Sequence, residues 1–361
     1  MQTKADEYFK ALFNRPEAEA LKVVATYSTE GGYKLKIDAT ANVKTDFMQM
    51  MGFNKLKVGA DSQVAWGNTK LRIGLSLDNT GSMKDNGKMD ALKAATKGLL
   101  TQLQTAAATN GDVYVSIVPF NKNVNVGDLG NKNSDWLNWA VWDLLNFSCT
   151  KKNENNLFDC LAAGGLWLPL SHNDWEGCVT DRDQPYDTTN SAPITSLLAS
   201  LFVTEKYDDC PAELMALSYD WKKLNKKVDD MEPNGMTNQT IGLQWAFQSL
   251  TASPFTIPPK DPNYKYSDII IHLTDGLNTQ NRWSKKQSEI DERTKLVCTN
   301  AKAAGVTIYA IQVNTTGDPT QQVLKDCAST PDKFFILNSA NQMVSTFQQI
   351  GTQLSNLRIA Q

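Results

Sequence analysis

The sequence has few of the residues that several common functions would need. Only two histidines occur in 361 residues, so a histidine-rich metal site is excluded. Lys and Arg total 36 against 39 Asp and Glu, a net charge of -3. This balance argues against a nucleic-acid binder, which usually shows a basic excess. No cysteine lies in a C-x-x-C pair, and no GxxxxGK loop is present. These absences exclude a zinc ribbon, a thioredoxin-type motif and a phosphate-binding P-loop.

Long apolar segments are also missing. No apolar run approaches the roughly 20 residues that span a bilayer, and the start, Met1–Asp6, lacks the apolar core of a signal peptide. We therefore expect a soluble chain, either cytosolic or exported with its leader or anchor removed. The six cysteines are even in number and widely spaced, which favours disulfides and an oxidising compartment over six buried thiols.

The first part of the chain predicts a small α/β extension over residues 1–68. A short helix is expected from Ala5 to Phe13, followed by a polar connection to residue 32. Apolar and polar residues alternate in Tyr33–Ala39 and again in 56–66, which is typical of half-exposed strands. A short Met-rich helix is expected between them, around Asp46–Met51.

Strands and helices alternate in two later parts of the chain, 69–120 and 235–361. Strands buried on both faces and separated by helices indicate a doubly wound, mostly parallel sheet of the α/β class. We assign both parts to one domain. The expected strands are 71–78, 113–120, 267–275, 306–313 and 334–337, and the expected helices are 88–107, 237–250, 284–304, 319–325 and one from 341 onward.

Residues 121–234 interrupt this alternation with a stretch rich in Asn, Asp and Trp. It contains four of the six cysteines and six of the nine tryptophans. Because a structureless loop of this length is improbable inside a compact domain, we predict a folded, disulfide-stapled insertion. Its tryptophans could form a core or a surface for a glycan or partner, and core is the favoured interpretation.

Oxygen-bearing side chains follow the apolar strands of the predicted sheet. In such sheets, ligands bind where strands end and helices begin. The candidate metal ligands are two carboxylates and three hydroxyls: Asp78, Thr80, Ser82, Thr237 and Asp275. All-oxygen sets suit a hard cation such as Mg²⁺, with Mn²⁺ or Ca²⁺ as alternatives. Neutral hydroxyls leave the ion electrophilic, so an acidic residue of a protein partner could complete its shell. The plainer alternative is that these residues are ordinary helix N-caps.

The order D-x-[ST]-x-S, then a distant Thr after Gly, then T-D-G, resembles the metal-ion-dependent adhesion site (MIDAS) of von Willebrand factor A domains. The resemblance covers 71–120 and 235–361; Thr80 departs from the commoner Ser but keeps the hydroxyl. A rival resemblance is to the phosphorylation loop of haloacid-dehalogenase-like ATPases, a Mg-dependent phosphotransferase with Asp78 as nucleophile. Asn79 in place of the loop lysine and the single carboxylate at Asp275 disfavour that rival.

Several further segments resemble the TadG-like proteins of tight-adherence (Flp) pilus assembly: Thr45–Met48, Ser76–Met83, Ile308–Ile311, Cys327–Ser329, Lys333–Phe335 and Leu357–Arg358. This resemblance implies a bacterial periplasmic or cell-surface protein, membrane-anchored through an N-terminal segment not visible here. It implies a Cys298–Cys327 disulfide. The insertion cysteines would pair among themselves, for which we choose Cys149–Cys160 and Cys178–Cys210, although sequence does not decide the connectivity.

These observations favour a non-enzymatic, metal-dependent protein-binding module that acts in pilus assembly or surface attachment. The alternative is an adhesin that binds a host or glycan ligand through the insertion.

Overall fold

The computed structural model describes residues 2–29, 33–45, 47–66, 69–127 and 132–359. The chain divides into two compact units. The first comprises Met1–Lys70, Lys260–Tyr266 and Ser355–Gln361, and the second comprises Leu71–Pro259 and Ser267–Leu354.

The first unit contains a three-stranded antiparallel sheet in the order β1-β2-β3. Its elements are α1 (Gln2–Leu12), β1 (Ala18–Ser28), β2 (Tyr33–Lys44), the 3₁₀ helix η1 (Met48–Met51) and β3 (Lys55–Trp66). The predicted helices and two strands are confirmed, although Asp46 lies outside the described residues. The predicted polar connection before residue 32 is wrong, because β1 occupies most of it. Alternation is present there, with Val23 buried, but neighbouring Val24 is exposed and obscures the pattern.

The second unit is built on a six-stranded sheet in the order β12-β5-β4-β13-β14-β15. The pairs β4–β5, β13–β14 and β14–β15 are parallel, and only the edge strand β12 is antiparallel among the pairings described. This confirms the predicted α/β class with a mostly parallel sheet. The strands are β12 (Met215–Ser218), β5 (Val113–Phe120), β4 (Thr69–Asp78), β13 (Lys265–Thr274), β14 (Thr307–Val313) and β15 (Phe334–Leu337).

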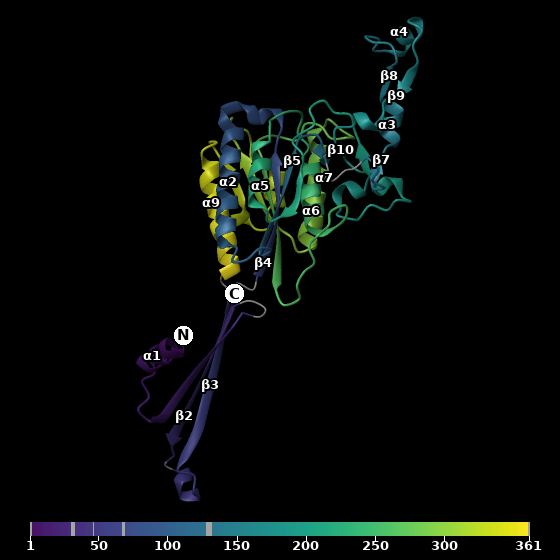
Figure 1. The fold of residues 1–361 in the computed structure, drawn as a ribbon. Helices are drawn as coiled ribbons and strands as arrows, with labels where there is room; N and C mark the ends of the chain where they lie inside the picture. The colour runs from purple at the N-terminus through teal and green to yellow at the C-terminus, as the bar shows by residue number, and fades with distance from the viewer. Residues whose placement is uncertain (1, 30–32, 46, 67–68, 128–131, 360–361) are drawn as a thin grey trace. The chain divides into compact units, whose positions relative to one another are not determined.

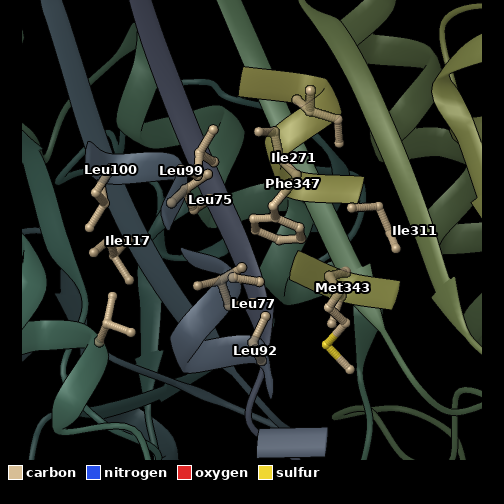
Figure 2. Packing of buried hydrophobic residues seen from close by; sticks show 14 of the residues in the cluster. Leu75, Leu77, Leu92, Leu99, Leu100, Ile117, Ile271, Ile311, Met343 and Phe347 are labelled. Atoms are coloured by element: carbon tan, nitrogen blue, oxygen red, sulfur yellow. The ribbon is translucent and has the colours of Figure 1, made fainter. Parts of the chain in front are cut away.

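Helices cover both faces of this sheet (Figure 1). One face packs against α2 (Lys88–Ala106), α5 (Trp221–Asp229) and α9 (Gln342–Ile359), and the other against α6 (Gln239–Thr251), α7 (Gln287–Ala303) and α8 (Gln322–Cys327). Figure 2 shows the first core, where Leu75 and Leu77 of β4 meet Leu92 and Phe347. Alternate residues of β13 and β14 enter the two cores, which explains the continuous apolar runs in their sequences.

The segment between β5 and α6 is folded, with little long regular structure. A small sheet has the order β6-β10-β11-β7, from β6 (Val124–Asn125), β10 (Cys178–Thr180), β11 (Phe202–Thr204) and β7 (Leu137–Asn138). A second part, the hairpin lobe (residues 144–169), pairs β8 (Phe147–Cys149) with β9 (Trp167–Pro169) and carries α4 (Leu157–Ala162); α3 (Ala140–Leu145) leads into it. Of the six tryptophans predicted to form a core here, Trp136 and Trp142 are buried, whereas the other four are partly exposed: Trp139, Trp167, Trp175 and Trp221. The predicted boundaries at residues 121 and 234 stay a prediction.

All six cysteines form disulfides, and all three predicted pairings are confirmed. Cys149–Cys160 closes the hairpin lobe, Cys178–Cys210 joins two parts of the insertion, and Cys298–Cys327 joins α7 to α8. Three disulfides in one chain are typical of an extracytoplasmic or surface location.

Candidate metal centre

The candidate site lies where the sheet changes its winding direction. From β4 the chain runs through α2 to β5 on one side, and from β13 it runs through α7 to β14 on the other. The loops that leave β4 and β13 therefore diverge, and such a switch point leaves a crevice at the carboxyl ends of the strands. Asp78 ends β4, and Asp275 directly follows β13.

Glycines let α6 pack closely against β4 and β5. A Cβ atom added at Gly74 of β4 would lie 3.1 Å from the carbonyl oxygen of Ala246, in α6. One added at Gly242 would lie 2.5 Å from the Phe120 ring. Larger side chains at these glycines would push the helix away from the sheet. Thr237 lies two residues before α6, so this close packing carries it toward Asp78.

Asp78 is fully buried, and both its carboxylate oxygens accept hydrogen bonds. Oδ1 accepts from the backbone N–H of Thr80 at 2.8 Å. Oδ2 accepts from the Thr274 hydroxyl at 2.6 Å and from the backbone N–H of Asp275 at 3.3 Å. These contacts fix the orientation of the Asp78 carboxylate and tie the end of β4 to the end of β13.

A chain of polar contacts links three other predicted ligands. The hydroxyl oxygens of Thr80 and Ser82 lie 3.0 Å apart. The Ser82 hydroxyl donates to Oδ1 of Asp275 at 2.7 Å. Oδ2 of Asp275 receives the ammonium group of Lys88, at 2.5 Å. Thr80 is buried, whereas Ser82 is exposed, so the group opens to solvent at Ser82.

Thr237 joins the same group from the loop before α6. A Cβ atom added at Gly276 would lie 3.6 Å from the Ser82 hydroxyl and 3.9 Å from the Thr237 hydroxyl, so both oxygens flank one point. The backbone N–H of Thr237 donates to the Thr279 hydroxyl at 2.8 Å. Its own hydroxyl has no hydrogen-bond partner among the described residues, which leaves its lone pairs for a ligand. The structure thus brings all five predicted residues together.

The insertion braces the Thr237 loop. Asn238 donates through Nδ2 to both oxygens of Asp181, at 3.1 and 2.9 Å. Asp181 also accepts from the backbone N–H of Arg282 at 3.1 Å. Burial raises the pKa of Asp181 to about 6, although these hydrogen bonds oppose the shift. On the other side of the loop, the backbone N–H of Met236 donates to the Tyr207 hydroxyl at 3.3 Å.

The donor set suits a hard divalent cation. It offers two carboxylates and three hydroxyls, the oxygen types that such ions prefer. A positive charge, the Lys88 ammonium, already lies against Asp275. No group of three or more His, Cys, Asp or Glu side chains suited to a metal occurs among the described residues, so a purely acidic or thiolate site is not an alternative there.

Asp78 carries the main electrostatic cost of the site. Burial, together with repulsion from Asp275, raises the pKa of Asp78 to about 7 from its ordinary value of 3.8. A cation bound beside it would lower this pKa, because an opposite charge favours the ionised form.

This shift predicts that the metal-free protein becomes less stable as the pH rises from about 4 to 7. The folded state holds a proton on Asp78 that the unfolded state has lost, so the Asp78 contribution is full below the unfolded pKa and is lost as the pH passes the folded pKa. Thermal unfolding in EDTA at pH 5 and pH 7.5 measures it. Asp78→Asn should flatten the dependence; an equal slope in both proteins would contradict the assignment.

Three neighbours of the site were not predicted as site residues. Lys88 was identified only as a helix start, and Thr274 only as part of the T-D-G motif. Asp181 had no sequence signal, because its contact with Asn238 spans 57 residues. His272 is buried, stacks on Phe120 and contacts the Ser76 hydroxyl through Nδ1 at 2.9 Å, so it lies in the core of the sheet.

Comparison with known proteins identifies the fold of the second unit. The family model for the von Willebrand factor type A domain matches residues 206–350, which include Thr237 and Asp275 but not the Asp78 loop. With the sheet order and helix layers described above, the second unit has the von Willebrand factor A fold. No curated protein matches the sequence.

Similar solved structures include two from pili and one from mussel byssus. The pilus adhesin SpaC from Lactobacillus rhamnosus GG is 14% identical with a TM-score of 0.44, covering 96% of this chain and 36% of its own. The vWF domain of the type V pili tip protein Mfa5 from Porphyromonas gingivalis is 11% identical, with a TM-score of 0.46. The match covers 82% of this chain and 98% of the Mfa5 chain. Proximal thread matrix protein 1 from the mussel byssus is 14% identical, with a TM-score of 0.40, in a structure described with a zinc-occupied MIDAS motif. The match covers 80% of this chain and 48% of the byssus protein chain. The chain thus spans little more than a third of SpaC.

Among the described residues, no helix combines the length and apolar character needed to cross a membrane.

Proposed function

We propose that the chain is a non-enzymatic, metal-dependent protein-binding module of bacterial tight-adherence (Flp) pilus assembly or surface attachment. The observation that supports this proposal is that five oxygen-bearing side chains converge at the switch point of the sheet, with Ser82 facing solvent. These residues are Asp78, Thr80, Ser82, Thr237 and Asp275. When bound there, Mg²⁺, Mn²⁺ or Ca²⁺ would supply positive charge that attracts an acidic residue of a pilus or surface protein.

The chain's own residues suit this role. Asp78 orients the loop from inside, while Ser82 leaves one side of the group open. Met236 precedes Thr237 and is 51% exposed, and Leu277 lies two residues after Asp275 and is 38% exposed. These apolar side chains would contact the surface around a partner's acidic residue and exclude water from the charged contact.

The burial of Asp78 disfavours the phosphotransferase hypothesis. Asp78 is fully buried, and both its oxygens are engaged by Thr80, Thr274 and the backbone of Asp275. A nucleophilic carboxylate must instead reach a phosphoryl group. A phosphoenzyme trapped on Asp78 would overturn the binding proposal.

The direct test is calorimetric titration of MgCl₂ and MnCl₂ into EDTA-stripped protein. We expect saturable binding of one cation per chain. We also expect the pilus or surface partner to be retained in Mg²⁺ and released in EDTA. Absence of cation binding to the folded wild-type chain would contradict the proposal.

The alternative function, an adhesin that binds through the insertion, is favoured by one observation. The hairpin lobe exposes large apolar side chains: Leu144 (74%), Leu145 (73%), Phe158 (82%) and Leu166 (61%). Scattered exposed apolar residues are common, but such gathering on a small stapled lobe is typical of interaction sites.

The adhesin alternative predicts a specific loss. Replacing Leu145 and Phe158 with Asn should abolish surface attachment, because these side chains would form the contact with the ligand. Pili should still assemble, because both side chains point to solvent and contribute little to folding. Attachment of cells carrying the double variant measures this. Leu12→Asn, at an 83% exposed position of α1, is the matched control. Unchanged attachment by the double variant would reject the alternative.

A further inference from the structure

Lys88 is an unusual neighbour for a metal centre. It is the first residue of α2, directly after the loop that carries Thr80 and Ser82. Its side chain is 5% exposed, and the Asp275 side chain it contacts is fully buried. Lysines are rarely buried to this degree unless they are paired. The Lys88–Asp275 pair is therefore built into the site and is not a surface ion pair.

The pair engages the oxygens that a cation would need. Oδ2 of Asp275 receives the Lys88 ammonium at 2.5 Å, and Oδ1 accepts from Ser82 at 2.7 Å. Both oxygens of Asp275 thus have partners within the protein. Ser82 can turn its hydroxyl lone pair toward an ion, whereas an ammonium group has no lone pair and only repels one.

The charges indicate competition. Asp78 and Asp275 supply at most two negative charges, and Lys88 cancels one of them. At low dielectric, an ammonium close to a divalent ion is strongly unfavourable. A cation bound beside Asp275 would therefore be repelled by Lys88, and this repulsion would oppose its binding for as long as Lys88 stays on Asp275.

We propose that Lys88 is an internal competing cation, which pairs with Asp275 in the metal-free site and lowers the affinity of that site for divalent ions. The proposal rests on the proposed metal-binding function. By reciprocity, cation binding weakens the Lys88–Asp275 contact by the same factor. The site then needs a higher cation concentration for half-saturation, unless a partner's carboxylate adds negative charge.

The test compares Mn²⁺ affinity with metal-free stability. Lys88→Met and Lys88→Gln remove the charge, and Gln can still donate a hydrogen bond to Asp275. Both variants are expected to bind Mn²⁺ at least about 10-fold more tightly in calorimetry, the factor that 1.4 kcal/mol gives. Both should also show a lower Tm than wild type in EDTA, because Asp275 loses its buried partner.

Two control variants separate competition by Lys88 from a general effect of charge or of folding on Mn²⁺ affinity. Lys84→Met removes an exposed lysine from the same loop and should leave the Mn²⁺ Kd unchanged. Lys88→Arg keeps the charge and should not tighten binding. A purely structural role for Lys88 would lower Tm without tightening Mn²⁺ binding.

The outcomes distinguish the two proposals. If wild type and all folded variants bind no Mn²⁺, the metal-binding function fails. If wild type binds Mn²⁺ and the folded Lys88→Met or Lys88→Gln protein binds it equally or more weakly, the competing-cation proposal is overturned. It is also overturned if neither variant folds in EDTA or in saturating Mn²⁺, since Lys88 would then be a structural residue.

Discussion

Replacing Asp78 with alanine is expected to weaken Mg²⁺ and Mn²⁺ binding by about 100-fold or more, beyond calorimetric detection. Loss of groups that only orient a ligand typically costs 10- to 100-fold in metal affinity, and Asp78 is a proposed ligand that also organises the loop. Its carboxylate joins the backbone of Thr80 to the hydroxyl of Thr274. The substitution therefore removes a negative charge and the anchor that orients the hydroxyls.

Two comparisons make this result specific. Asp78→Asn keeps the shape and one accepting oxygen, so it should fold like wild type and still bind cations poorly. Asp85→Ala removes an exposed carboxylate from the same loop and should leave the affinity unchanged. Retention of wild-type Mg²⁺ or Mn²⁺ affinity by folded Asp78→Ala would show that the site assignment is wrong.

Removing the Cys298–Cys327 disulfide by a double alanine substitution is expected to lower the free energy of unfolding by about 3–4 kcal/mol. The bond closes a separation of 29 residues, and cross-linking such a loop restricts the unfolded chain by about that amount. Both cysteines are buried in the core between α7, α8 and the sheet, so truncated side chains add a small packing loss. Urea unfolding under oxidising conditions measures the change.

The matched control is the Cys149–Cys160 pair, which closes a separation of 11 residues in the hairpin lobe. Its double alanine variant should loosen the lobe, detected as faster proteolysis there, while the core keeps its urea midpoint. Equal losses of core stability in the two variants would show that lobe and core unfold as one unit.

Much of the sheet was predictable because its strands are buried on both faces. Continuous apolar runs such as 267–275 are distinctive, and the helices between them show apolar spacing on one face. The same reasoning failed at β1, where the strand lies mostly at the surface and burial imposes little pattern. The antiparallel edge strand β12 was also missed, because its four residues lie within the polar insertion.

The disulfide pattern was predicted with mixed support. The Cys298–Cys327 pair followed from the family resemblance, while sequence left the insertion pairing open. The structure selects Cys149–Cys160 and Cys178–Cys210 because folding of the insertion brings these Cα atoms within 5.6 and 5.8 Å. Sequence spacing carries no information on that approach.

The sequence by itself determined the α/β class and the oxygen-rich candidate residues, because both depend on local patterns of burial and on residue chemistry at strand ends. Tertiary structure alone decided three things. It assembled the three loops around one point, through the close approach of α6 to β4 at Gly74. It placed Asp181 of the insertion behind the Thr237 loop. It also turned Lys88 inward onto Asp275, which no local pattern indicates, because that contact joins residues 187 positions apart.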